Sequence, residues 1–158
     1  MKEDYIHYAA REFLKKEDWI LIAGEYPNGS DDELHSLKIM DRYLARDNSP
    51  DSRRHSLNKL VPDLIAYKDN EFLIVEMKPT YSKSDEEKLE EIMTTRIQEL
   101  TYYLEEFLER YKIIPISTVK AGSFVPCLGF KSTAKYPEKE GFSYILVSSL
   151  DDAQLKRY

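Results

Sequence analysis

The sequence has few of the residues that build cross-linked or membrane-embedded proteins. It contains one cysteine, Cys127, which excludes an internal disulfide and a four-thiolate metal site. No run approaches the roughly 20 apolar residues that cross a bilayer, so we expect no membrane partner. The N-terminus opens with Glu3 and Asp4 rather than with the basic and apolar pattern of a signal peptide. These features predict a cytoplasmic protein in which Cys127 is a small core residue of a strand.

What the sequence does contain is typical of a folded domain with an uneven distribution of charge. Its 158 residues, 42% hydrophobic and 33% charged, predict a single domain over 1–158. The net charge is −6, yet residues 42–60 carry five Lys/Arg against two Asp, and residues 112–139 carry five Lys against one Glu. Residues 81–110 hold nine Asp/Glu against four Lys/Arg. The pattern allows a DNA-binding face, although an ordinary solvated surface explains the charges equally well.

Hydrophobic periodicity predicts a mixed α/β domain with a central sheet flanked by helices. The expected helices are 3–16, about 31–46, which begins at the capping-box residues Ser30 and Glu33, and about 84–111. The expected strands are 19–23, 60–67, 72–78, 116–119, 125–130 and 144–147. The strands 60–67 and 72–78 form a β-hairpin, and about 29–59 is a helical insertion that precedes it.

Three charged residues interrupt the apolar strands of this hairpin: Asp63, Glu76 and Lys78. If Tyr67 pairs with Phe72 across the loop, Asp63 lies opposite Glu76, with side-chain bases roughly 5 Å apart. Glu76 and Lys78 are two residues apart and therefore face the same side. The pattern predicts two carboxylates and one ammonium at one place.

Two close carboxylates repel each other, and a hard divalent cation relieves that repulsion. Mg²⁺ needs few carboxylates and often takes further ligands from water and phosphate. A lysine beside the metal can orient or deprotonate an attacking water. The arrangement suits metal-assisted hydrolysis of a phosphodiester. The alternative is a structural ion pair of Lys78 with Glu76 or Asp63.

Pro62-Asp63 followed by Glu76-Met77-Lys78 on the next strand resembles the PD-(D/E)XK nuclease superfamily. The resemblance implies a restriction-endonuclease-like core of helix, three strands, helix and strand. It implies that Asp63 and Glu76 bind Mg²⁺, with the Met77 carbonyl as third ligand and Mn²⁺ as a substitute. It also implies that Lys78 is the catalytic lysine and that DNA is the substrate.

Many members of that superfamily add an acidic residue from the first helix. Glu12 is our choice as the catalytic residue, and Glu3 is its rival. Each lies roughly 80–100° from the centre of the apolar stripe, so each can reach the site from the boundary of the helix. A solvated glutamate is the alternative interpretation for both.

Gln98 and Tyr102 resemble the Gln-x-x-x-Tyr motif of the RecB-like branch. In that branch Gln98 would serve catalysis and Tyr102 would contact DNA. The two residues lie roughly 130° and 170° from the apolar centre of their helix, which places them on its outward face.

Phosphate contacts are expected from basic residues around the hairpin, namely Arg53, Arg54, Lys59 and Lys83. The histidines show neither metal-ligand spacing nor a nucleophile partner, and we expect all three, His7, His35 and His55, on the surface. Of these, His55 lies beside Arg53 and Arg54 and could also contact phosphate.

The sequence therefore predicts a Mg²⁺-dependent DNA endonuclease. One site cuts one strand, so double-strand cleavage requires a homodimer or a partner subunit. The alternatives are a RecB-like exonuclease and a nuclease-like module that binds DNA or protein without cleaving.

Overall fold

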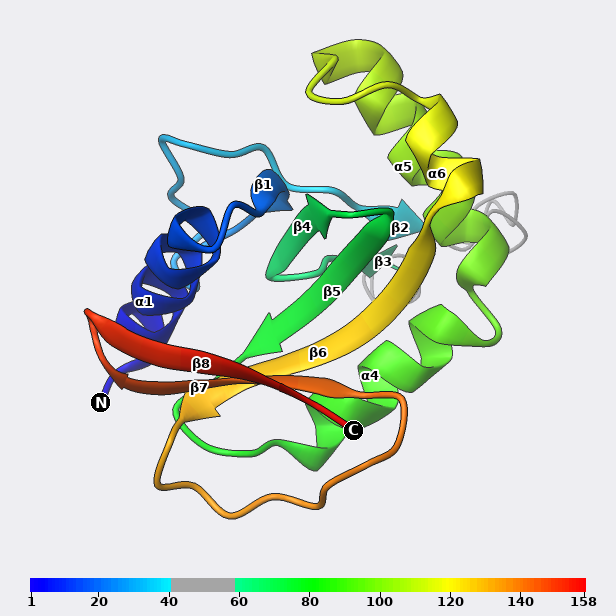
Figure 1. Ribbon diagram of the computed structural model, residues 1–158. Helices are drawn as coiled ribbons and strands as arrows, with labels where there is room; N and C mark the ends of the chain where they lie inside the picture. The colour runs from blue at the N-terminus through cyan, green and yellow to red at the C-terminus, as the bar shows by residue number, and fades with distance from the viewer. Residues whose placement is uncertain (41–58) are drawn as a thin grey trace, which may run out of the picture.

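The computed structural model describes residues 1–40 and 59–158. Within these ranges, six strands form one sheet and two short strands pair separately. The strands of the sheet are β1 (Ile20–Gly24), β4 (Leu64–Lys68), β5 (Glu71–Met77), β6 (Ser123–Lys131), β7 (Ser143–Ser149) and β8 (Asp152–Arg157), and they lie side by side in that order (Figure 1). The separate pair is β2 (Ile39–Met40) with β3 (Lys59–Leu60).

The sheet is mixed, with both antiparallel and parallel neighbours. β1, β4 and β5 are antiparallel, β5, β6 and β7 are parallel, and β8 returns antiparallel to β7. The parallel step from β5 to β6 requires a crossover, which is supplied by α4 (Lys83–Met93), α5 (Ile97–Tyr111) and α6 (Ser117–Ala121). Helix α1 (Glu3–Lys16) precedes β1. The expected α/β class with a mixed central sheet is confirmed.

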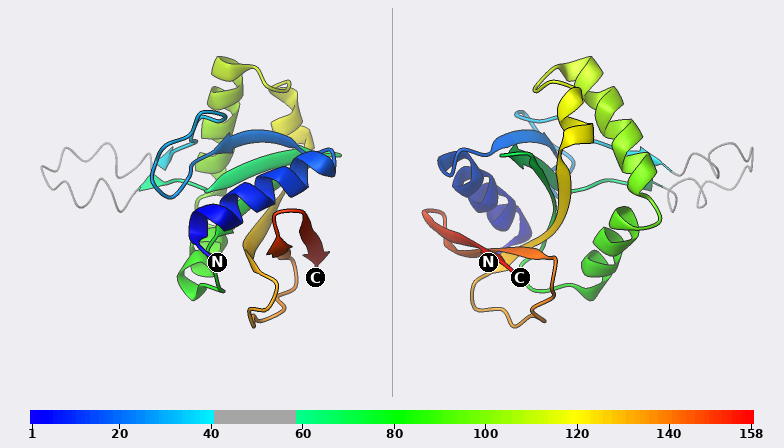
Figure 2. Two further views of the ribbon diagram at one scale, coloured as in Figure 1. Left: turned by 90° about the vertical axis from the view of Figure 1, so that its left-hand side faces the viewer. Right: turned by 45° about the vertical axis from the view of Figure 1, so that its right-hand side comes forward.

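Helices cover both faces of the sheet, which explains why its central strands are apolar on both sides (Figures 1 and 2). Helix α1 packs on one face, in a buried cluster that includes Ile6, Leu14, Leu64, Val75 and Met77. Helices α4 and α5 pack on the other face, in a cluster that includes Ile65, Ile74, Leu89, Leu104 and Leu128. The end of β5 therefore lies between the two helical layers.

The hairpin forms in the predicted register. Tyr67 pairs with Phe72, and the ladder continues to Leu64 opposite Val75. Asp69 and Asn70 make a two-residue turn, with φ of 49° and 64°. Two consecutive positive φ values are those of a type I′ turn, whose twist matches that of the strands. The turn thereby fixes which residues meet at the far end of the hairpin.

The predicted helix over about 31–46 is wrong for the residues that the structure describes. Residues 31–38 are not helical, and Ile39–Met40 is strand β2. The side chain of Asp31 accepts from the amides of Glu33 and Leu34 and also binds Arg11 of α1. A local turn and a tertiary ion pair thus replace the expected helix start. Residues 41–58, which include the rest of the expected helix and most of the helical insertion, lie outside the described residues.

The predicted helix over about 84–111 is two helices, separated at residues 94–96. Thr94 and Thr95 each donate a side-chain hydrogen bond to a carbonyl four residues earlier, at 2.7 and 3.2 Å. Such bonds from β-branched residues weaken a helix. The break changes the direction of the chain between α4 and α5 (Figure 1).

The C-terminal part of the chain differs from the prediction in two places. The strand expected at 116–119 is wrong, because Ser117–Ala121 is the helix α6, which begins just after Pro115. Strand β8 was not expected, because it is an edge strand that is largely exposed and carries few apolar residues. In the described ranges, none of the helices has the length and apolar character needed to cross a membrane.

Candidate active site

Two carboxylates meet where the ladder of the hairpin stops. The amide of Asp63 donates a hydrogen bond of 2.8 Å to Oε2 of Glu76. The amide of Met77 donates one of 2.8 Å to Oδ2 of Asp63. The structure therefore brings the two predicted carboxylates together, and the backbone holds one oxygen of each.

The two carboxylates are crowded and poorly solvated. Glu76 is 2% exposed, and the side chain of Asp63 is 26% exposed. Burial raises the pKa of Glu76, and the carboxylate of Asp63 raises it further. Burial also raises the pKa of Asp63, although the hydrogen bond from the Met77 amide lowers it in part. A pair of this kind favours a shared proton or a nearby cation.

Lys78 lies between the two helical layers rather than on the carboxylate pair. Its Nζ is 3.5 Å from Oε1 of Glu3 in α1 and 3.6 Å from Oδ2 of Asp85 in α4. The predicted alternative, an ion pair of Lys78 with Glu76 or Asp63, is not what the structure contains. Burial lowers the pKa of Lys78, but Asp85, Glu3 and Asp63 outweigh burial, so the net shift is upward. Lys78 is a cation at neutral pH.

The counter-ion of Glu76 is Lys88, which is not among the predicted site residues. Lys88 extends from α4, forms an ion pair with Oε1 of Glu76 and donates a 2.9 Å hydrogen bond to the carbonyl of Val61. Asp85 and Lys88 lie three residues apart, on the same side of the helix. The sequence shows an acid followed one turn later by a lysine directly after the hairpin, but not that the lysine pairs with Glu76.

Helix α1 faces the site with a stripe of polar residues spaced every four positions. Such residues share one face of a helix. Each contacts a carboxylate or ammonium on a neighbouring segment: Glu3 with Lys78, His7 with Asp63, Arg11 with Asp31, and Lys15 with Glu33. The i, i+4 spacing is visible in the sequence, but its partners are distant in the chain. Of this stripe, only Glu3 is among the residues that the sequence predicts for the site.

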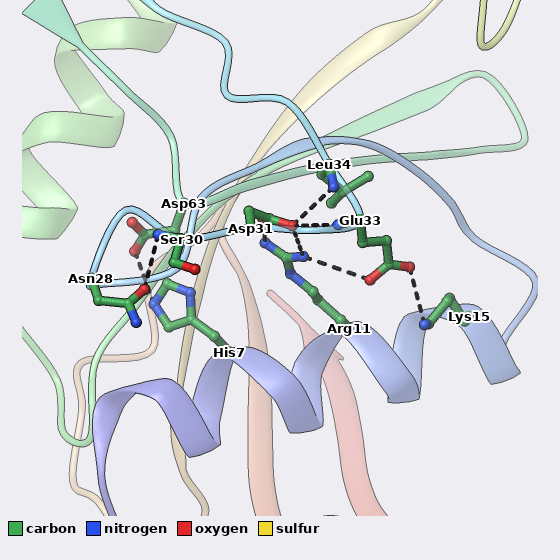
Figure 3. A network of polar contacts seen from close by, with 9 residues as sticks. All are labelled: His7, Arg11, Lys15, Asn28, Ser30, Asp31, Glu33, Leu34 and Asp63. Carbon is green, nitrogen blue, oxygen red and sulfur yellow. Dashed lines mark hydrogen bonds and ion pairs between the residues drawn. The ribbon is translucent and has the colours of Figure 1, made fainter.

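His7 is buried, which corrects its predicted place on the surface. It has no exposed area, and its Nε2 lies 3.7 Å from Oδ2 of Asp63 (Figure 3). Neither ring nitrogen forms a hydrogen bond with the described part of the chain. Burial lowers the pKa of His7 to about 4, and the charges of Arg11 and Lys78 act in the same direction. A neutral imidazole therefore faces Asp63.

Arg11 fixes the segment after β1 against α1. Its side chain is 1% exposed and binds Asp31 at 2.5 Å (Figure 3). The guanidinium carbon also lies 4.1 Å from the ring centre of Tyr26. A Cβ at Gly24 would lie 2.7 Å from Nη2 of Arg11 and 2.8 Å from Cδ1 of Leu34, so a larger residue there would force these side chains to shift. This contact positions α1, and with it Glu3 and His7.

The first-helix acid nearest Lys78 is Glu3, the rival, and not Glu12. Glu12 forms an ion pair of 2.8 Å with Lys15. At about 1.5 Å per residue, Glu12 lies roughly 13 Å along α1 from Glu3. The structure therefore does not bring Glu12 to the hairpin residues.

Gln98 and Tyr102 lie on the outward face of α5, where periodicity places them. Gln98 is exposed, and Tyr102 is 43% exposed. The break at 94–96 separates them from α4, which carries Asp85 and Lys88. The structure does not place this pair beside the two carboxylates.

The remaining predicted residues are scattered. Lys83 is exposed at the first position of α4, and Lys59 belongs to β3, whereas Arg53, Arg54 and His55 lie outside the described residues. His35 is exposed, as expected, and stacks on Tyr111 with ring centres 4.2 Å apart. Cys127 is fully buried in β6, which confirms its predicted role in the core.

Within residues 1–40 and 59–158, no three or more side chains of His, Cys, Asp or Glu are grouped to hold a metal ion. Comparison of the chain with family models, curated proteins and solved structures gave no match.

Proposed function

We propose that this chain is a Mg²⁺-dependent DNA endonuclease with a restriction-endonuclease-like core. The observation that carries the proposal is the pairing of Asp63 with Glu76 at the end of a hairpin, with Lys78 two residues further along β5. The order of α1, three antiparallel strands, helices and a parallel β6 supports it, because the resemblance to PD-(D/E)XK nucleases implies the same order.

The residues present fit a hard divalent cation. Asp63 and Glu76 supply two crowded carboxylates, and Nε2 of His7 lies beside Asp63. Mg²⁺ needs few protein carboxylates, because water and phosphate complete its coordination. Asp63, Glu76 and the carbonyl of Met77 would hold the ion, which lowers the pKa of a bound water and offsets charge on the phosphate.

The other residues of the site act through charge and position. Lys78 is held as a cation by Glu3 and Asp85 and is 43% exposed at its side chain, so it can meet a phosphate or orient the attacking water. We assign to Glu3 and Asp85 the positioning of this ammonium. We propose that His7, rather than Glu12, is the residue of α1 that acts beside Asp63.

DNA is the proposed substrate, and the contacts to it extend beyond the hairpin. Lys83 is exposed two positions before Asp85, at the start of α4. Arg53, Arg54 and Lys59 are proposed to add contacts that lower affinity as salt rises. Cleavage of both strands requires a second copy of the chain or a partner subunit.

One observation favours a second function, a nuclease-like module that binds without cleaving. The ion pair of Lys88 with Glu76 already neutralises one carboxylate without a metal. A protein that only binds DNA or another protein would keep such a pair permanently. A RecB-like exonuclease, the third candidate, requires Gln98 and Tyr102 to act from the outward face of α5.

Supercoiled plasmid separates these functions. We expect nicking with Mg²⁺ or Mn²⁺ and none with EDTA, and we expect Asp63→Asn to abolish it while Glu12→Gln does not. Degradation of linear DNA alone would indicate the exonuclease. DNA binding without cleavage under either metal would indicate the module.

A further inference from the structure

Lys88 pairs with one of the two carboxylate oxygens of Glu76, which is a proposed metal ligand. Glu76 has two oxygens, and both are engaged: Oε2 accepts from the amide of Asp63, and Oε1 pairs with Lys88. A divalent ion that binds Glu76 needs one of these oxygens at about 2.1 Å. The backbone contact is part of the hairpin, so the lysine is the partner that can leave.

We infer that Lys88 is an internal cation that holds the metal position of Glu76 in the metal-free protein and is released when a divalent ion binds. The inference rests on the proposed function. Metal binding is then an exchange of one cation for another, and the Lys88 side chain of α4 has different contacts in the metal-free and metal-bound protein.

The burial of the two partners supports this direction of movement. The side chain of Glu76 is 3% exposed, whereas that of Lys88 is 26% exposed. Lysine carries its charge on a flexible four-carbon stem, so the ammonium can move while the helix stays in place. Its hydrogen bond to the carbonyl of Val61 is a second anchor that does not involve Glu76. A released Lys88 therefore keeps a partner beside the hairpin.

Charge gives the consequence for affinity. An ammonium beside a carboxylate lowers the affinity of that carboxylate for a second cation, because like charges repel and the contact must first be broken. Removing the charge of Lys88 should therefore tighten metal binding. A purely structural ion pair would have the opposite effect, since its loss would disturb the carboxylate that the metal uses.

The test is calorimetric titration of the purified chain with Mn²⁺ and Mg²⁺ at fixed ionic strength. Lys88→Met removes the charge and keeps the length of the side chain. Lys120→Met is the matched control, because Lys120 is exposed in α6 and loses the same charge. We expect Lys88→Met to bind Mn²⁺ at least tenfold more tightly than the natural chain, and Lys120→Met to stay within twofold of it.

A second measurement needs no folded variant. In the natural chain, the side-chain ¹⁵N signal of Lys88 should shift or broaden when Mg²⁺ is added, while that of Lys120 should not. A Lys88 signal that is unmoved at saturating Mg²⁺, or equal affinities of the natural chain and Lys88→Met, overturns the inference and leaves the metal site standing. Failure of both proteins to bind either metal overturns the proposed function as well.

Discussion

The backbone amide of Asp63 is hydrogen-bonded to the carboxylate of Glu76 across the end of the hairpin, at 2.8 Å. At this position an amide would ordinarily continue the ladder by donating to a carbonyl. It donates to a side chain instead, so the conformation of the strand end and the orientation of the carboxylate are fixed together. A change at either residue therefore tests the site and its local structure at once.

Asp63→Asn separates charge from shape. The amide side chain retains an oxygen that can accept from Met77, so we expect the melting temperature to change little. Loss of the negative charge should lower the affinity for Mg²⁺ and the cleavage of plasmid together. Metal titration and a nicking assay on the same preparation measure both. Full cleavage by a folded Asp63→Asn protein would exclude this carboxylate as a ligand.

His7 predicts a dependence of stability on pH. Its folded-state pKa is about 4, against about 6.5 for an ordinary histidine, because burial opposes the charged form. Between these values the unfolded chain binds a proton that the folded chain does not. The contribution of His7 to stability therefore rises with pH through this window and is lost as pH falls from about 6.5 towards 4.

The variant His7→Gln isolates this effect. Urea denaturation between pH 4 and 7.5 should show the natural chain gaining about 3 kcal/mol relative to His7→Gln as pH rises. All other titrating groups are common to both proteins, so the difference reports His7. Parallel stability profiles would show that His7 is not held neutral by burial.

Glu3 and Glu12 form a matched pair on one helix. Glu3 contacts Lys78, whereas Glu12 contacts Lys15. We expect Glu3→Gln to lower cleavage several-fold, because the ammonium loses one of its two positioning carboxylates. Glu12→Gln should stay within twofold of the natural rate. Both contacts are partly exposed, so neither change should cost more than about 0.5 kcal/mol of stability. The reverse ranking of the two rates would restore Glu12 as the first-helix acid.

The sequence predicts the hairpin correctly because the information that sets it is local. Period-two patterning and a short turn fix the register, and a slip of one residue would turn every core side chain to the wrong face. The same pairing register places Asp63 opposite Glu76. The register of the hairpin therefore agrees with the structure.

His7, Asp85 and Lys88 were missed because their partners are supplied by packing between layers. Nothing near His7 in the sequence marks it as buried beside Asp63, which lies 56 residues later. The expected helix at 31–46 failed for a related reason. The capping-box residues Ser30 and Glu33 do not begin a helix there, because Asp31 forms a tertiary contact with Arg11. No pattern within that segment indicates this contact.

Gln98→Ala tests the RecB-like alternative. Gln98 is exposed on α5, so its loss should leave stability within about 0.5 kcal/mol of the natural value. For the proposed endonuclease we expect near-normal cleavage of plasmid. A loss of tenfold or more on linear DNA, with an unchanged melting temperature, would instead support the exonuclease.

Lys78→Met tests whether Lys78 serves cleavage while Asp63 and Glu76 bind the metal. The side chain of Lys78 is 43% exposed, and its contacts with Glu3 and Asp85 are longer than 3.4 Å. Its removal should therefore cost only about 1 kcal/mol, far less than the roughly 3–5 kcal/mol lost when a buried pair is broken.

Mg²⁺ binding should survive or tighten, because a neighbouring positive charge is gone. Cleavage should still fall by roughly 10² or more, since the water and the phosphate lose their cation. Thermal melts with and without Mg²⁺, beside those of Asp63→Asn, measure each part. A sharply lower melting temperature for Lys78→Met, with no change in the response to Mg²⁺ in either variant, would mean that the lysine holds the fold together and does not serve an active site.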